Sequence, residues 1–120
     1  MSGHHDLGRR GEALAARYLQ SRGWAILARN FRWGRREIDL VARRRGLVAF
    51  IEVKTRAGSG FGHPLEAITR AKRAEIAFVA RSWVARHGRP GDRYRFDAIA
   101  IHWAEGEPPV IEHIPDAWRL

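Results

Sequence analysis

The segment Leu47–Arg56, which reads LVAFIEVKTR, constrains the fold more than any other part of this sequence. Side chains two positions apart in a strand share a face, and both faces of this segment are apolar. Such a strand is covered on both sides, as in the sheets of α/β proteins. Glu52 and Lys54 interrupt one of these faces. The segment therefore predicts a central strand that carries two charged side chains into a core.

The other predicted elements complete an α/β domain with a central mixed sheet flanked by helices, in the order α-β-β-β-α-β-β. Short connections between the first three strands favour an antiparallel meander. The predicted elements are a helix at 7–22, strands at 24–30, 36–43 and 47–56, a helix at 64–87, and strands at 94–102 and 110–114. Gly88 is expected to end the second helix, and Thr69 offers an N-cap that would split it.

The length of 120 residues allows one hydrophobic core, so we expect a single domain at 1–120 with its core at about 8–118. Residues 1–6 are polar and are expected to be frayed. The stretch 57–64, which reads AGSGFGHP, carries three glycines and a proline and predicts a mobile loop.

The composition favours a polyanionic partner, because 22 lysines and arginines against 13 acids give a formal charge of +9. DNA is the expected partner, with RNA as an open alternative. The absence of cysteine excludes disulfides, zinc-thiolate sites and thiol nucleophiles. No stretch approaches the roughly 18 apolar residues of a membrane span, so a cytoplasmic protein without a membrane partner is expected.

Two carboxylates are predicted to meet beside the central strand. Strand alternation places Glu37, Asp39 and Val41 on one face of the preceding strand, with Ile38, Leu40 and Ala42 on the other. If the two strands form a hairpin, Asp39 lies close to Glu52, and the pair needs a proton or a cation between them. Mg²⁺ or Mn²⁺ suits such an oxygen site. The alternative is a salt bridge from Lys54 to either acid that only fixes the strand register.

Two further charged residues fall on apolar helix faces. Glu12 shares the sheet-facing arc of the first helix with Ala15 and Ala16, so it is a candidate third carboxylate for the metal. An ion pair with a sheet arginine explains its position nearly as well. Lys72 lies on the apolar stripe of the second helix and is a candidate phosphate contact, or else a lysine that snorkels past the core edge.

The run ARNFRWGRRE at 28–37 alternates guanidinium and aromatic groups, which suits phosphate contacts and base stacking. Its candidate nucleic-acid contacts are Arg29, Arg32, Trp33, Arg35 and Arg36. The alternative is that Phe31 packs in the core and the arginines are ordinary turn residues. Glu37 and His63 are possible accessory residues of the site, and Asp97 is expected to have a structural role beside Arg95.

Five segments together resemble the bacterial YraN family: GRRGEALAARYL, REIDLVAR, FIEVKTR, FGHPLEAITRAKR and RFDAIAI. That family is similar to the PD-(D/E)xK nuclease superfamily, in particular the archaeal Holliday junction resolvases. The resemblance covers roughly residues 8–118. It implies a restriction-endonuclease-like core.

The resemblance also implies roles for single residues. Asp39 resembles the first metal-binding aspartate of the superfamily, Glu52 the second acid and Lys54 the motif lysine, while Glu12 resembles the helix-one glutamate of the resolvases. Ile38 stands where the superfamily motif often has proline, and Arg36 where the family usually has glycine. Catalytic roles for Asp39, Glu52, Lys54 and Glu12 are therefore expectations from this resemblance.

The leading hypothesis is a Mg²⁺- or Mn²⁺-dependent endonuclease that hydrolyses phosphodiester bonds of structured or branched DNA. One alternative is a nucleic-acid-binding module without turnover, and another is a repair-associated interaction protein on a nuclease fold. A homodimer is compatible with each of these, although no segment of the sequence identifies a dimer surface.

Overall fold

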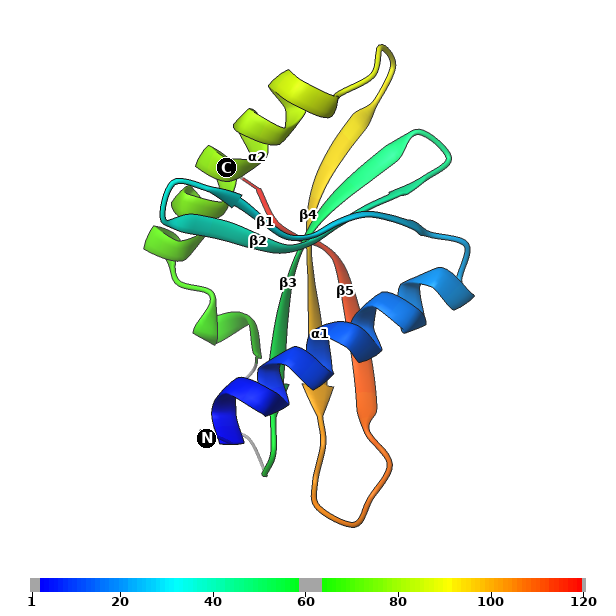
Figure 1. The fold of residues 1–120 in the computed structure, drawn as a ribbon, viewed down its shortest axis with the longest axis vertical. Coiled ribbons are helices and arrows are strands. Elements are labelled where there is room, and N and C mark those ends of the chain that lie inside the picture. The colour runs from blue at the N-terminus through cyan, green and yellow to red at the C-terminus, as the bar shows by residue number, and fades with distance from the viewer. Residues whose placement is uncertain (1–2, 59–63, 120) are drawn as a thin grey trace.

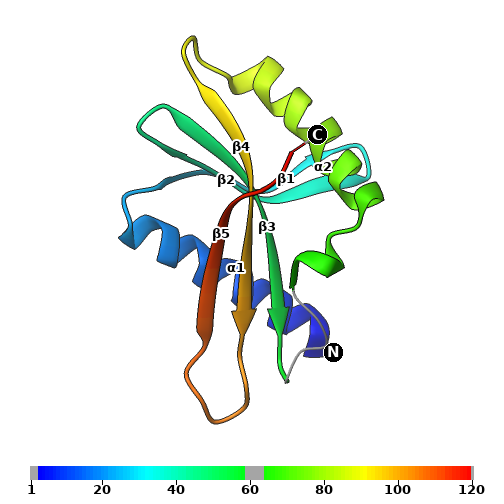
Figure 2. The same cartoon turned by 180° about the vertical axis from the view of Figure 1, so that it is seen from behind.

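The computed structural model describes residues 3–58 and 64–119, which form one five-stranded sheet with a helix on each face (Figures 1 and 2). In chain order the elements are α1 (Gly3–Ser21), β1 (Ala25–Trp33), β2 (Arg36–Arg44), β3 (Leu47–Arg56), the 3₁₀ helix η1 (Pro64–Ala67), α2 (Arg70–His87), β4 (Arg93–His102) and β5 (Val110–Trp118). The predicted element order is confirmed.

The sheet has the strand order β1-β2-β3-β4-β5. The first three strands form the predicted antiparallel meander, β3 pairs in parallel with β4, and β4 pairs antiparallel with β5. A parallel pair needs a crossover connection, and α2 supplies it. The sheet is therefore mixed, as predicted, with β3 at its centre.

Two apolar clusters fill the space between the sheet and its helices. Under α1, buried residues of that helix pack on Leu40, Ala49 and Ile51. Under α2, Ile76, Val79 and Trp83 pack on the other face of the sheet. Because each face of β3 meets a different helix, alternate residues of this strand pack in different clusters.

Gly11 sets the close approach of α1 to β3. A Cβ atom at this position would lie 1.8 Å from Thr55 Oγ1, well inside van der Waals contact. Only glycine lets the helix backbone come this near the strand. The contact lies beside Glu12, so the same glycine fixes how near Glu12 stands to the sheet.

Several element boundaries differ from the prediction. α1 begins at Gly3, so residues 3–6, expected to be frayed, are helical. Thr69 does split the second helical segment, since its Oγ1 accepts a hydrogen bond of 3.2 Å from the Lys72 N–H. β1 continues to Trp33 and β5 to Trp118. Of the stretch predicted to be a mobile loop, residues 59–63 lie outside the described residues.

The alternation predicted for β2 breaks at Asp39. Ile38 packs in the cluster under α2 together with Val41, whereas Leu40 and Ala42 pack under α1. Ile38 and Leu40 were predicted to share a face, and that prediction is wrong. The change of face coincides with the end of the pairing between β2 and β3, so the strand twists away from its neighbour at this aspartate.

Among residues 3–58 and 64–119, no helix is long and apolar enough to cross a membrane.

Candidate functional site

A fork in the sheet brings the two predicted carboxylates together. The regular pairing of β2 with β3 ends at Leu40 opposite Ile51, and Asp39 and Glu52 are the next residue on each strand. Beyond this point the two strands diverge, with the β1–β2 hairpin leading toward α2 (Figure 1). The Asp39 carboxylate spans the fork, because its Oδ2 accepts a hydrogen bond of 2.8 Å from the Val53 N–H.

The carboxyl groups of Asp39 and Glu52 form a buried pair. Their residues are 7% and 4% exposed, and each side chain acts on the pKa of the other. Burial and the charge of Glu52 raise the pKa of Asp39 to about 8, against an ordinary value of 3.8. Burial also raises the pKa of Glu52. Two adjacent buried carboxyls cannot both ionise without a cation, so near neutral pH they hold a proton between them.

Glu12 of α1 joins this pair from the side of the first helix. Its Oε1 accepts a hydrogen bond of 3.0 Å from Asn30 Nδ2. Burial raises the pKa of Glu12, and the nearby charge of Asp39 adds to the effect. The alternative in which an arginine pairs with Glu12 is wrong, since the partner observed is an asparagine. A third carboxyl group therefore faces the pair at the fork.

Asn30 was not predicted as a site residue. It lies on β1 with a φ of 51°, a left-handed conformation that asparagine adopts more readily than most residues. In this conformation its side chain reaches Glu12. An asparagine in the middle of an otherwise apolar and basic strand is the only signal that the sequence carries for this role.

Two lysines face the carboxyl cluster from different elements. The positive charges of Lys72 on α2 and Lys54 on β3 both act to lower the pKa of Glu52 against the effect of its burial. Within the described part of the chain, neither lysine forms an ion pair with Asp39 or Glu52. The predicted register-fixing salt bridge is therefore absent. Lys72, predicted as a phosphate contact or as a lysine that snorkels past the core edge, places its positive charge near Glu52.

The cluster fits a hard divalent cation by the chemistry of its donors. Glu52 Oε2 is buried and has no hydrogen-bond partner, so a strong acceptor stands unused in the core. The donors are carboxylate oxygens, which Mg²⁺ and Mn²⁺ prefer. In the described residues no three acidic or histidine side chains converge as a ready cation cage. Mg²⁺ commonly uses one or two carboxylates and completes its shell with water and phosphate.

The accessory candidates have different outcomes. Glu37 is half-buried on β2, adds to the charge that raises the pKa of Asp39, and forms a 3.4 Å ion pair with Arg32. It therefore belongs to the edge of the cluster. His63 lies outside the described residues, so its predicted accessory role has no structural outcome.

The basic and aromatic run forms the hairpin between β1 and β2, and it packs on α2. Phe31 packs at the edge of the apolar cluster under α2, as the alternative reading of the run predicted for this residue. Trp33 is 37% exposed. The predicted arginine contacts are all exposed on this hairpin: Arg29, Arg32, Arg35 and Arg36.

Asp97 stands apart from this site as a structural acid, as predicted. It accepts hydrogen bonds from Arg95 Nε and Nη2 at 2.7 and 2.9 Å and from the Asp116 N–H at 3.0 Å, and its Oδ2 lies 2.8 Å from His113 Nε2. Burial would raise the pKa of Asp97, but contacts with His113, Arg95 and Asp116 lower it below its ordinary value. This carboxylate joins β4 to β5.

Comparison with known sequences gives one family and many bacterial relatives. The profile described as "Uncharacterised protein family UPF0102" matches residues 11–101. A UPF0102 protein of Clavibacter michiganensis is 43% identical over 117 residues, covering 98% of this chain and 99% of the relative. One of Geobacter metallireducens is 43% identical and covers 100% and 98%. One of Nocardia farcinica is 46% identical and covers 90% and 85%.

Proposed function

We propose that this chain, which belongs to the uncharacterised family UPF0102, is a divalent-metal-dependent nuclease that hydrolyses phosphodiester bonds in structured or branched DNA. UPF0102 is the YraN family, which the five segments of the sequence resemble. The observation that carries the proposal is the buried Asp39–Glu52 pair, with an unpartnered Glu52 oxygen and two lysines beside it. Perturbed carboxyl groups that face a charged cluster are typical of functional sites.

Each residue of the cluster has a role in this proposal. Asp39 and Glu52 would hold Mg²⁺ or Mn²⁺, with Glu12 as a third acid near the same region. A bound cation would supply Lewis-acid activation of the scissile phosphate and of the attacking water. Lys54 and Lys72 place positive charge beside Glu52, where they stabilise the charge that develops on the phosphate. Asn30 positions Glu12 through its 3.0 Å hydrogen bond.

The proposal includes membership of the PD-(D/E)xK superfamily. The order α-β-β-β-α-β-β supports it, as does the placement of Asp39 and the Glu52-Val53-Lys54 motif on adjacent strands. A fold alone does not specify chemistry, so the proposal depends on the site. The carboxyl pair at the fork is the feature that a purely structural role explains least well.

Cleavage of labelled DNA tests the activity. The purified protein is incubated with junction, flap, single-stranded and blunt duplex DNA, with Mg²⁺ or Mn²⁺ and with EDTA. Glu52→Gln is expected to lower the cleavage rate at least about 100-fold, since one electrostatic group at a reacting centre is typically worth that much. The matched control, Glu75→Gln, removes an exposed carboxylate of α2 and should cleave like the unmodified protein. Cleavage that survives both EDTA and Glu52→Gln contradicts the proposal.

Thermal unfolding gives a readout of the cation that does not depend on turnover. A cation that binds only the folded state raises Tm with its concentration. We expect millimolar Mn²⁺ to raise Tm for the unmodified protein and for Glu75→Gln, and to leave Tm of Glu52→Gln unchanged. An equal shift in all three proteins would place the cation elsewhere.

A second candidate function is nucleic-acid binding without turnover. The observation that favours it is the exposed basic and aromatic hairpin between β1 and β2, which offers phosphate contacts that need no cation. A binding module loses affinity steeply as salt rises, because counterions are released from DNA, and it requires no divalent cation for binding. Binding that resists EDTA, together with no cleavage of any of the four substrates, would select this function.

A further inference from the structure

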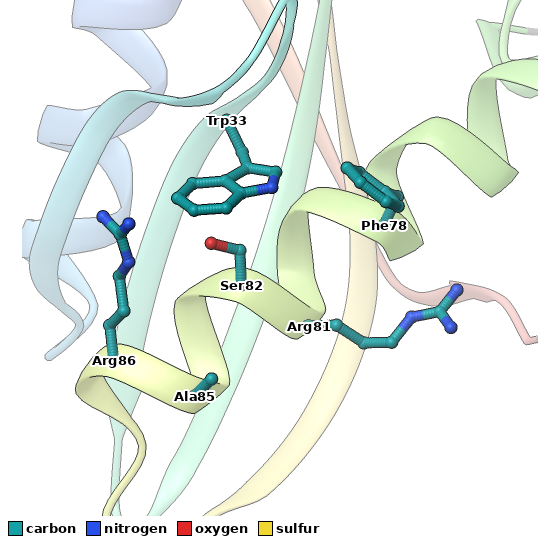
Figure 3. Close-up of a pocket in the computed structure, with 6 residues that line it drawn as sticks. All are labelled: Trp33, Phe78, Arg81, Ser82, Ala85 and Arg86. Atoms are coloured by element: carbon teal, nitrogen blue, oxygen red, sulfur yellow. The ribbon is translucent and has the colours of Figure 1, made fainter.

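The hairpin between β1 and β2 lies beside α2, with a pocket of about 360 Å³ between Trp33 and the helix. Figure 3 shows the Trp33 indole above the helix, Ser82 and Ala85 beneath it, Phe78 on one side and Arg86 on the other. This volume falls within the range of small-ligand pockets, roughly 300–1,000 Å³. The pocket does not include the carboxyl cluster.

We propose that this pocket binds an unpaired base of nucleic acid, so that the substrate carries a single-stranded segment next to the site of cleavage. The inference rests on the proposed function for its class of ligand. It adds the strand form that is recognised and the residues that recognise it. The helix side of the pocket was not predicted from the sequence, which pointed only to the hairpin.

The aromatic groups of the pocket are exposed and already carry stacked guanidinium groups. Trp33 is 37% and Phe78 is 45% exposed. The Arg86 guanidinium lies 4.2 Å from the Trp33 ring centroid, and that of Arg36 lies 5.0 Å from the Phe78 ring. Exposed rings interleaved with arginine are the usual platform for unpaired bases, which every aromatic face can stack against. The arrangement offers base stacking and phosphate contacts together.

The charge around the pocket favours a polyanion over a second copy of this chain. No carboxylate lines the pocket, and within the described residues Arg36, Arg81 and Arg86 form no ion pair with an acid. A two-fold interface centred here would bring these arginines close to the same arginines of the second copy, and the like charges would repel. A nucleic-acid strand instead places phosphates beside these three groups.

The pocket lies near the carboxyl cluster along two elements. Arg36 lies over the Phe78 ring at the edge of the pocket, and Asp39 follows it three residues later on β2, a rise of about 10 Å. Lys72 faces Glu52 from the first turn of α2, and Phe78 follows it by six residues, about 9 Å along the helix axis. A strand with one base in the pocket therefore reaches the cluster with a phosphate only a short distance along its chain.

Fluorescence anisotropy with matched DNA ligands tests the inference. The ligands are a blunt duplex, the same duplex with a single-stranded tail, and the tailed duplex with abasic sites in the tail, all in EDTA so that no cleavage interferes. Trp33→Ala is expected to weaken binding of the tailed duplex by ~5- to 150-fold, the usual cost of one lost base stack. Blunt-duplex affinity should change by less than about 2-fold. Trp33→Phe, which keeps a ring, should retain most of the affinity.

The abasic ligand decides whether a base is recognised. The unmodified protein should bind the abasic tail as weakly as Trp33→Ala binds the normal tail. For Trp33→Ala, the abasic sites should cause no further loss of affinity. Equal losses on all three ligands would overturn the inference, because the pocket would then contact only the backbone. Unchanged binding in Trp33→Ala would overturn it as well.

Two controls separate base recognition from a general effect of charge and from dimerisation. Arg86→Gln should weaken tailed-duplex binding more than Arg17→Gln, which removes an equal charge from an exposed position on α1. Sedimentation of the free protein tests the second-copy alternative, since a dimer that Trp33→Ala dissociates would overturn the inference. Tail-dependent binding without metal-dependent cleavage would support base recognition in the pocket and contradict the nuclease proposal. Failure of the pocket inference and failure of the nuclease proposal therefore give different results.

Discussion

Asp97 and the Asp39–Glu52 pair are buried acids on the same sheet, and the protein treats them in opposite ways. Asp97 is fully buried, yet contacts with His113, Arg95 and the Asp116 N–H lower its pKa. Asp39 and Glu52 are nearly as buried, but each faces another carboxyl and the pKa of both is raised. A buried acid with every oxygen satisfied holds the fold together, whereas one left short of partners is available to a ligand.

The difference also decides what each region contributes to stability. The contacts of Asp97 tie β4 to β5 at the bulge in their pairing. The carboxyl pair at the fork keeps an unpartnered oxygen in the core, which costs stability. Sites that carry such a cost for the sake of function are common in natural proteins.

The largest expected effect is at Asp97. Asp97→Ala leaves Arg95 and His113 without their carboxylate, and breaking a buried ion pair in this way typically costs about 3–5 kcal/mol. The free energy of unfolding, measured in urea, should fall by that amount. Asp116→Asn is the control, because it removes an exposed charge, suits the left-handed backbone at this position and leaves the backbone N–H that binds Asp97. A loss under about 1 kcal/mol for Asp97→Ala would remove the contrast between the two regions.

The next effect concerns the approach of α1 to the fork. In Gly11→Ala the new methyl group overlaps Thr55 Oγ1, so α1 must shift, at a cost of about 1–3 kcal/mol. Glu12 moves with the helix, so the cleavage rate should fall as well. Gly8→Ala, on the same helix with nothing within 4 Å of its Cβ position, should instead stabilise by about 0.5–1 kcal/mol. Equal effects at both glycines would show that the close contact is unimportant.

Removal of one acid at the fork should stabilise the protein. Asp39→Asn removes a charge from the pair and keeps an oxygen that can accept the Val53 N–H, so we expect a gain of about 1–2 kcal/mol at pH 8. Asp39→Ala loses that acceptor and should gain less. Both variants should lose metal-dependent cleavage. Urea unfolding without divalent cations measures the gain, and a loss of stability in Asp39→Asn would mean that the pair supports the fold.

The pH dependence of stability should have opposite signs in the two regions. The raised pKa of Asp39 means that between about pH 4 and 8 the folded protein binds more protons than the unfolded chain, so stability falls as pH rises. The slope is at most about 1.4 kcal/mol per pH unit for one proton. The lowered pKa of Asp97 gives stability that is present above about pH 4 and lost as pH falls. Asp39→Asn should remove only the first dependence in metal-free unfolding curves.

Much of the fold and the centre of the site follow from local patterns in the sequence. The doubly apolar Leu47–Arg56 segment predicts the central strand to the residue, because a strand covered on both faces has few other solutions. Short turns predict the hairpin, and with it the meeting of Asp39 and Glu52. The helical wheel of α1 turns Glu12 toward the same place.

The features that could not be predicted depend on tertiary geometry. Alternation places Ile38 with Leu40, but the strand twists at the fork and separates them. Asn30 reaches Glu12 because of its left-handed backbone, which no periodicity signals. The pocket beside α2 is formed by Trp33 and residues of the helix that lie far from it in the sequence. No pattern in the sequence links these residues to the hairpin.

The bond from the Val53 N–H to Asp39 Oδ2 makes one backbone amide a reporter of the fork. Its neighbours on β3 exchange hydrogen with solvent only when the sheet itself opens, since their partners are strand carbonyls. The partner of Val53 is a carboxyl oxygen, whose strength as an acceptor changes whenever a proton leaves or a cation arrives. Exchange at this single amide therefore reports whether a proton or a cation has reached the carboxyl pair, as long as the sheet around it stays closed.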